Sequence, residues 1–229
     1  MYPLIIFLRK PKRISKSYII ETNKTMRKQT TTIIFDWAGV FCVPGEPFSH
    51  PKLPKETGFT VDEMGDKTQR LQIPYYKGAV TTNEFWKSII NCLKIKNISP
   101  NELSRAYLSS YSIYPEMLEL AKNLKNKYKT AILSNLTEEM MDHITATHKV
   151  NECFKFTFFS NKIGLVKPDK EAFEYALKKI NSTPRETIFV DDSKRNVEAA
   201  KKLGFDAFVF ESPAQCKQEL EKRGIKTEY

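Results

Sequence analysis

Short apolar runs alternate with amphipathic segments along most of the chain. Five of the runs are rich in β-branched and aromatic residues and are predicted as strands: 31–35, 130–133, 155–159, 187–190 and 206–210. Amphipathic helices are predicted between the later runs, over 115–128, over 170–180 and from Ser193 to Gly204. Because strands this apolar must be covered on both faces, the pattern predicts an α/β fold with a three-layer core and a parallel sheet.

The segment between the first two predicted strands is too long for one connecting helix. Inside it, two helix starts carry capping boxes, Thr81-Thr82-Asn83-Glu84 and Ser99-Pro100-Asn101-Glu102. The sequence therefore predicts a helical cap over 44–113 that begins with a Pro-rich loop over 44–60. The core is then formed by 30–43 together with 114–229.

The positive charge is concentrated at the amino terminus. The formal net charge is +10, and the first 30 residues hold eight Lys or Arg against one acid. The rest of the chain, with 29 basic and 26 acidic side chains, is close to balance, which argues against a nucleic-acid groove. Residues 1–29 are interpreted as a basic extension that is disordered or mis-assigned: either Met26 is the true start, or residues 1–25 are a loose extension. A membrane-surface or RNA-binding arm is the alternative.

Hydropathy and cysteine spacing bear on whether the chain spans a membrane and on its redox compartment. No apolar run approaches the roughly 20 residues of a membrane span. The four cysteines are scattered without a CxxC pair, so we expect buried free thiols in a reducing compartment. The expectation is a cytoplasmic protein that binds neither nucleic acid nor a membrane, with its oligomeric state left open.

Acidic and hydroxyl side chains lie at the ends of three predicted strands. Asp36 follows the first, Ser134 with Asn135 follows the second, and Asp191 with Asp192 follows the run that ends at 190. The carboxyl ends of parallel strands meet at one edge, so these side chains are expected to converge. Each has an ordinary alternative as a turn or N-cap residue. Two adjacent acids are nevertheless costly without a nearby cation, and Mg²⁺ is the natural partner.

A lysine and the start of a helix could supply the groups that bind a phosphate. Lys167 would normally be a solvated surface charge, but Pro168 restrains the backbone and Asp169 is placed to begin the helix over 170–180. A fixed ammonium could offset negative charge on a phosphate, and the hydroxyl and N–H groups near Ser134 could bind its oxygens. A carboxylate nucleophile, a hydroxyl, a cation and an acid pair together suit phosphoryl transfer.

These segments resemble the motifs of the haloacid dehalogenase-like (HAD-like) hydrolases, in the branch with a helical cap after the first strand. The resemblance covers residues 31 to about 212. It implies a Rossmann-like core with the first strand central. It also implies a magnesium-dependent phosphohydrolase acting on a small phosphorylated metabolite, with a sugar phosphate as one candidate. That substrate would be its only implied partner.

The resemblance also implies roles for individual residues. Asp36 would be the nucleophile that forms an aspartyl-phosphate, and Lys167 would stabilise charge. Ser134, Asn135 and Lys167 would bind the phosphate. The magnesium ligands would be Asp36, the backbone carbonyl of Ala38, Asp191 and Asp192.

Ala38 departs from the pattern of the family's phosphatases, which usually read Asp-x-Asp here. The second acid protonates the leaving oxygen and later activates water, and Ala38 can do neither, so we expect weak turnover on poor leaving groups. Glu46 and His50, on the loop that follows, are weak candidates to replace it.

Two other functions stay open from the sequence. A 2-haloacid dehalogenase also lacks the second acid, but such enzymes do not usually keep the acidic pair, and Phe173 stands near where they carry a tyrosine. A catalytically weak phosphate-binding protein is the other alternative. Retention of charged residues that are costly to bury argues against it.

Overall fold

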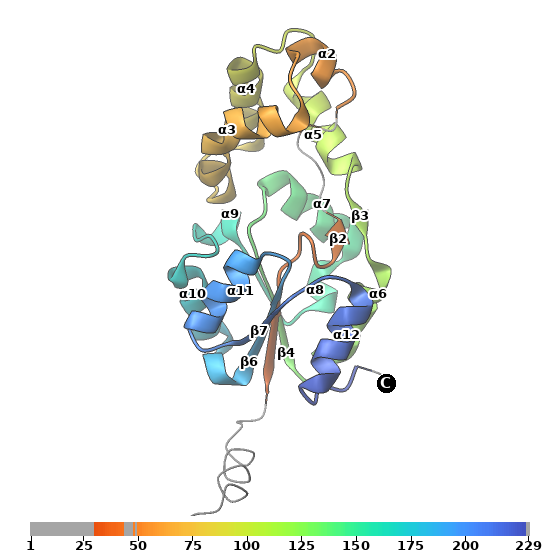
Figure 1. The fold of residues 1–229 in the computed structure, drawn as a ribbon, viewed down its shortest axis with the longest axis vertical. Coiled ribbons are helices and arrows are strands. Elements are labelled where there is room, and N and C mark those ends of the chain that lie inside the picture. Colours follow the sequence, from red (N-terminus) through yellow and green to blue (C-terminus); the bar gives the residue numbers. More distant parts are fainter. Residues whose placement is uncertain (1–29, 44–47, 49, 228–229) are drawn as a thin grey trace, which may run out of the picture.

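The predicted strands form one parallel sheet at the centre of the molecule. The computed structural model describes residues 30–43, 48 and 50–227, so the predicted extension at 1–29 lies outside the described residues. The strands are β1 (Thr32–Phe35), β4 (Lys129–Ser134), β5 (Phe156–Phe159), β6 (Thr187–Asp191) and β7 (Asp206–Val209). Their order is β5-β4-β1-β6-β7 (Figure 1), which confirms the α/β fold with the first strand central.

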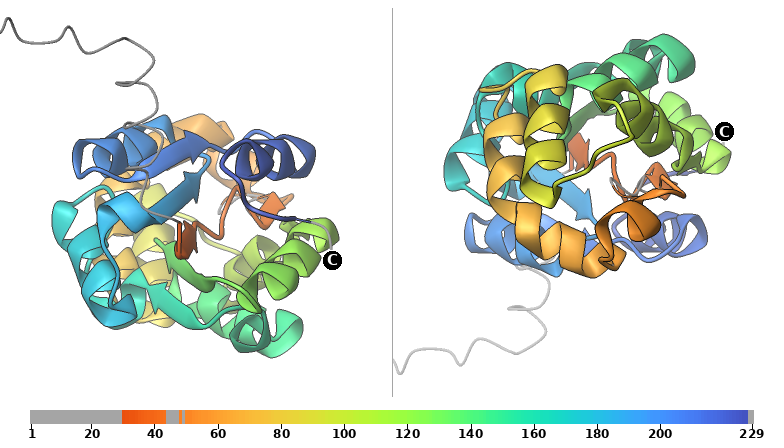
Figure 2. Two further views of the ribbon diagram at one scale, coloured as in Figure 1. Left: turned by 90° about the horizontal axis from the view of Figure 1, so that it is seen from below. Right: turned by 90° about the horizontal axis from the view of Figure 1, so that it is seen from above.

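Helices cover both faces of this sheet (Figure 2). One face carries α6 (Pro115–Lys125), α8 (Val150–Cys153) and α12 (Pro213–Lys222), and the other carries α10 (Lys170–Ile180) and α11 (Lys194–Lys202). Successive side chains of β1 alternate between the two layers, with Ile33 and Phe35 in one cluster and Ile34 in the other. This is the three-layer arrangement expected for strands that are buried on both sides.

The three predicted helices begin at or within one residue of their predicted starts, at Pro115, Lys170 and Lys194. Helix α7 (Glu138–His148) starts after Thr137, whose hydroxyl accepts a bond from the Met140 N–H, and α9 (Ser160–Ile163) and a 3-10 turn η1 (Pro184–Glu186) complete the core. Asp169 and Ser193 occupy the N-cap positions of α10 and α11, but neither side chain caps its helix. The predicted N-cap positions are therefore confirmed, but the expected side-chain capping bonds are not formed.

A group of helices interrupts the core between two short strands. It consists of α2 (Leu53–Thr57), α3 (Val61–Tyr76), α4 (Thr82–Leu93) and α5 (Pro100–Ser109), which we call the helical insert. Strands β2 (Cys42–Val43) and β3 (Ser112–Ile113) flank the insert and pair antiparallel. Figure 1 shows the insert above the carboxyl ends of the sheet strands, where the predicted site residues lie.

The start of the insert differs in detail from the expectation. The capping boxes at Thr81 and Ser99 are confirmed, and a third at Thr60 begins α3. The loop predicted over 44–60 was wrong in part, because α2 lies within it. Leu53 is fully buried and Pro54 fits the first turn of a helix, so this Pro-rich stretch can form a helical turn.

The described residues bear on the expectations about membrane-spanning segments and about the four cysteines. None of the helices described is long and apolar enough to cross a membrane. All four cysteines are free; Cys42, Cys153 and Cys216 are buried, whereas Cys92 is partly exposed. The expectation of free thiols is confirmed, and that of full burial fails at Cys92.

Phe173 belongs to the core and not to a site. It is fully buried between α10 and the sheet, with its ring 5.3 Å from that of Phe189 and 5.8 Å from that of Phe205. We expect Phe173→Ala to lower the free energy of unfolding by about 3–5 kcal/mol, because it removes a large buried side chain and leaves a cavity. Glu174→Ala, on the exposed face of the same helix, should change it by less than about 0.5 kcal/mol. Urea unfolding of the two variants measures the difference, and similar losses in both would contradict this account.

Candidate active site

Asp36 is held rigidly at the carboxyl end of β1. Its backbone N–H donates to the Val190 carbonyl at 2.8 Å, which ties it to the neighbouring strand β6. Its Oδ1 accepts a bond from the Trp37 N–H at 2.7 Å and contacts Lys167 Nζ at 2.9 Å. Oδ2 takes neither of these contacts and is the oxygen available to a ligand. Burial raises the pKa of Asp36 to about 7, against the opposing effect of Lys167.

Lys167 lies buried between two carboxylates. Its Nζ is 2.6 Å from Asp191 Oδ2 and 2.9 Å from Asp36 Oδ1, and its side chain is 1% exposed. Burial opposes the charged ammonium, but the two carboxylates outweigh it and raise the pKa of Lys167. The lysine is therefore a fixed cation and not the solvated surface charge of the ordinary alternative.

Ser134 and Asn135 follow β4 and have different surroundings. The Ser134 hydroxyl is close enough to Asp36 to lower the pKa of that carboxyl, yet it makes no hydrogen bond of good geometry with any described group. A buried hydroxyl without such a bond is suited to donate to a phosphate oxygen. The Asn135 side chain instead clamps the Lys167 backbone, accepting from its N–H at 2.8 Å and donating to its carbonyl at 2.9 Å. The side chain of Asn135 is thus already hydrogen-bonded. Phosphate binding by this residue stays a prediction, which would use its backbone N–H.

The two adjacent acids differ in their surroundings. Asp191 is fully buried, and its carboxylate accepts bonds from Lys167, from the Ser193 N–H and from Asn196. Asp192 is exposed, and its carboxylate lies over the backbone of Gly39. A Cβ at Gly39 would stand 2.0 Å from Asp192 Oδ2, and the φ of +83° is itself unfavourable for other residues. Glycine is therefore required for Asp192 to approach the Asp36 loop.

The donor set fits a divalent cation. Asp36, Asp191 and Asp192 each offer a carboxylate oxygen, and these oxygens all lie within 4.8 Å of one another. Three carboxylates meet one ammonium here, so negative charge is in excess when all are ionised. Hard oxygen ligands of this kind suit Mg²⁺, which retains waters and phosphate oxygens in its shell. Desolvation and the neighbouring Asp191 raise the pKa of Asp192, as expected for an acid in a crowded negative site.

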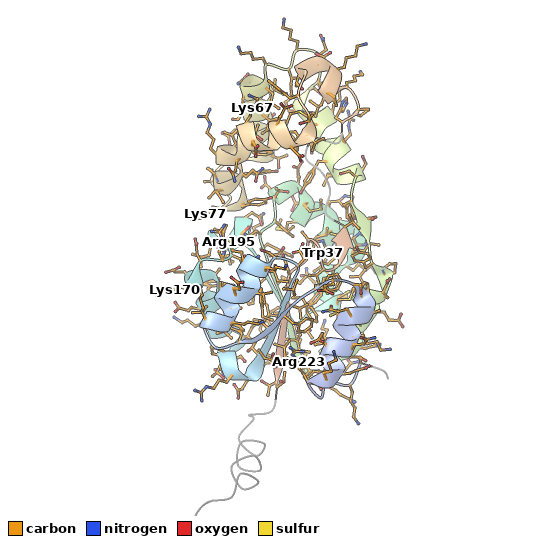
Figure 3. All side chains as sticks on the ribbon, viewed as in Figure 1. Trp37, Lys67, Lys77, Lys170, Arg195 and Arg223 are labelled. Carbon is orange, nitrogen blue, oxygen red and sulfur yellow. The ribbon has the colours of Figure 1, made fainter. Side chains whose placement is uncertain are left out.

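The structure also shows the surroundings of Ala38, which stands where the sequence departs from the Asp-x-Asp pattern. Ala38 is half-buried against the core, and its backbone forms a β-bridge with Cys42. Trp37, the residue before it, lies in the core below the helical insert (Figure 3). Glu46 lies outside the described residues. The Nδ1 of His50 accepts from the Lys52 N–H at 3.3 Å, and the imidazole is near Glu102 at the start of α5. These contacts place His50 with the insert, and no described contact joins it to Asp36.

Sequence reasoning missed two residues near the site. Asn196 donates to both oxygens of Asp191 at 3.0 and 3.1 Å, and its only signal was its place in the first turn of the helix after the acid pair. Tyr76, at the end of α3, is brought near Asp36: burial and the Asp36 charge raise its pKa. No local pattern marks Tyr76, because its position depends on how the insert packs on the core.

Comparison with known proteins identifies the family. Residues 61–210 match the model of the haloacid dehalogenase-like hydrolases, and the chain belongs to this family. The match begins after Asp36 and Ala38, so it does not bear on the roles of these two residues. D-Ribitol-5-phosphate phosphatase of Bacteroides thetaiotaomicron is 28% identical over 152 residues, which is 63% of this chain and 73% of that enzyme. Bifunctional epoxide hydrolase 2 of Rattus norvegicus is 28% identical over 132 residues, 56% of this chain but only 24% of its own length.

A solved structure shares the fold. A HAD family enzyme of Bacteroides thetaiotaomicron, in complex with magnesium and inorganic phosphate, superposes with a TM-score of 0.70 at 24% identity. The match covers 80% of this chain and 94% of that one. It supports the arrangement of a parallel sheet with a helical insert.

We expect Lys167→Met to destabilise the metal-free protein in a pH-dependent way. An acid whose pKa is higher in the folded protein keeps its proton at pH values where the unfolded chain has already released it. The free energy of unfolding therefore falls as pH rises from the pKa in the unfolded chain to the pKa in the folded protein. Without Lys167, the largest effect that opposes this rise in the pKa of Asp36 is lost. The predicted loss is about 3–5 kcal/mol near pH 8 and smaller near pH 5, where protonated acids repel less.

Urea unfolding with a chelator, at both pH values, measures this effect. Lys170→Met is the matched control, because that lysine is 64% exposed on α10. An equal loss at both pH values would contradict the assigned role of Lys167.

Proposed function

We propose that this protein is a magnesium-dependent phosphatase that acts on a small phosphorylated metabolite through an aspartyl-phosphate. The observation that carries the proposal is the meeting of Asp36, Ser134, Lys167 and Asp192 at one edge of the sheet. Sugar phosphates are the first substrate class to test, since one relative is named a D-ribitol-5-phosphate phosphatase.

The roles of the residues follow from their contacts. Asp36 Oδ2 attacks phosphorus, the bond from phosphorus to the leaving oxygen breaks, and the leaving oxygen takes its proton from solvent water, since Ala38 offers none. Ser134 donates its hydroxyl to a phosphate oxygen, and Lys167 offsets the negative charge of the phosphoryl group while fixing Asp36. Water then attacks the phosphorus and loses a proton to solvent, and the bond from phosphorus to Asp36 Oδ2 breaks, which releases inorganic phosphate and restores the carboxylate.

Asp36, Asp192 and the Ala38 carbonyl would hold the magnesium ion. When bound, the ion would neutralise phosphate charge and orient the phosphoryl group. Asp191 lies in the same acidic cluster and stays a further candidate ligand. Because its oxygens also accept bonds from Lys167, Ser193 and Asn196, we propose that it positions Lys167 as well.

The helical insert would act as a cap over this site. Residues 44–113 remain the proposed extent of the cap, joined to the core through β2 and β3. Tyr76 of α3 lies close enough to Asp36 for the carboxylate to raise its pKa, which supports this role of the insert. Closure of the insert would exclude water during phosphoryl transfer.

Asp36→Asn should reduce hydrolysis of an aryl phosphate to the background rate, because a neutral amide is not a nucleophile toward phosphorus. A chelator should abolish the activity of the unaltered protein, and added Mg²⁺ should restore it. Phosphate release measured with and without the chelator tests both statements. Activity that survives in Asp36→Asn would contradict the proposal.

Ala38 favours one second candidate, a 2-haloacid dehalogenase, which needs neither the second acid nor magnesium. Release of halide from a 2-haloacid in the presence of chelator would support that function. A protein that binds phosphate without turning over either substrate would be a weak phosphate-binding member of the family.

Ala38→Asp tests whether a missing acid limits the rate. We expect turnover of alkyl phosphates to rise toward the about 10²–10⁴-fold that general acid–base catalysis supplies, with a smaller gain on aryl phosphates, whose leaving groups need less protonation. Steady-state kinetics on one substrate of each kind gives the comparison. An unchanged or lower rate on alkyl phosphates would show that the missing acid is not the limitation.

A further inference from the structure

A histidine–tyrosine–histidine cluster joins the helical insert to the core. Tyr111 lies between the end of α5 and β3, where the chain returns from the insert, and we call residues 110–114 the return segment. The phenol oxygen of Tyr111 is 2.5 Å from His148 Nε2 and 3.0 Å from His143 Nε2. Both histidines lie on the core helix α7, so two of the three histidines in the chain meet at one hydroxyl.

The two hydrogen bonds require at least one neutral imidazole. The phenol has a single proton, so it donates to one Nε2 and accepts from the Nε2–H of the other histidine. One protonated histidine is compatible with this arrangement. When both are protonated, the phenol proton has no acceptor and two positive charges share one oxygen, which is unfavourable for half-buried side chains. The cluster therefore accommodates one imidazolium but not two.

The groups around the cluster provide no counter-charge for a second imidazolium. The titratable groups that face it are the two histidines of α7, Cys42 of β2 and Cys153 of α8. Burial raises the pKa of both thiols, so they are uncharged near neutral pH. From the loop after β1, the uncharged ring of Trp37 lies 6.3 Å from the ring of His148. Among the described residues, no carboxylate forms an ion pair with either imidazole.

Helix α7 holds the insert at both of its ends. At the amino end, Glu139 accepts from the Trp86 Nε1–H of α4 and from the Ser104 hydroxyl of α5. Toward the carboxyl end, the two histidines bond Tyr111, which follows α5. Loss of the second contact would free the return segment and leave the bonds of Glu139 as the pivot of the insert.

We propose that His143, Tyr111 and His148 form an acid-sensitive latch, which holds the return segment against α7 near neutral pH and releases it when both histidines are protonated. Because this segment carries the insert, its release changes how firmly the insert is held over the core. The proposal concerns the position of the insert and does not rest on the phosphatase function.

The direction of the pH dependence follows from the surroundings of His148. Burial lowers the pKa of this histidine, and the charge of His143 lowers it further. The unfolded chain takes up the proton near the ordinary value of about 6.5, whereas the folded protein takes it up only at a lower pH. The stability that the neutral cluster contributes is therefore fully present above about pH 6.5 and is lost as the pH falls through the pKa in the folded protein.

Hydrogen–deuterium exchange of the full chain tests the latch. The protection factor is the intrinsic exchange rate at each pH divided by the measured rate, so it corrects for the pH dependence of exchange itself. Between about pH 7.5 and about pH 5, the protection factor of the return segment should fall by about tenfold, as expected for loss of the hydrogen bonds in the cluster. Peptides from β4 should keep their protection. Unchanged protection in the return segment would overturn the proposal.

A double variant, His143→Gln with His148→Gln, separates the latch from the acids of the protein. Asp36 and Glu139 have raised pKa values, and both are unaltered in this variant. The fall in protection of the return segment should disappear, because a glutamine side chain donates and accepts but does not titrate. A fall of the same size in the variant would show that another group causes it, and this result would also overturn the proposal.

Tyr111→Phe removes the shared hydroxyl, and Tyr114→Phe is the matched control in the same segment. The return segment of Tyr111→Phe should already be about tenfold less protected near neutral pH and should change little on acidification. Tyr114→Phe should behave like the unaltered protein, and equal behaviour of the two variants would contradict the latch. Both substitutions keep the size of the ring, so they decide the question even if the glutamine variant fails to fold.

Discussion

The candidate site depends on one buried ammonium. Lys167 Nζ lies between Asp36 and Asp191, which follow and end neighbouring strands. Two carboxylates so close together in the interior would repel, and removing the cation from such a cluster typically costs several kcal/mol. Because Asn135 clamps the Lys167 backbone, the cation is fixed before any ligand arrives. Asp36 is thereby left with one oxygen committed to this contact and the other open.

Much of this arrangement could be predicted from the sequence. Asp36, Ser134 and Asp191 lie at the carboxyl ends of apolar runs, and parallel strands bring such ends to one edge. Local pattern is enough for that step, because strand type and burial follow from the apolar runs themselves. Lys167 was harder to place, since its assignment depended on the resemblance to a family and on the proline beside it.

The remaining residues depend on tertiary packing. The pattern showed two adjacent acids but not that Asp191 would face Lys167 while Asp192 faces Gly39. Glu139 looks like an ordinary acid in the first turn of a helix, and only the approach of α4 and α5 buries it. Helix α2 formed in a stretch rich in proline because Leu53 could be buried, which no local signal revealed.

The central claim is that Asp36 accepts a phosphoryl group. The most direct measurement is rapid acid quenching of the protein with labelled acetyl phosphate, followed by peptide mapping by mass spectrometry. The account predicts a phosphate on the peptide that contains Asp36, formed with Mg²⁺ and absent with a chelator. Phosphate release with no covalent label, or a label on a different residue, would contradict it.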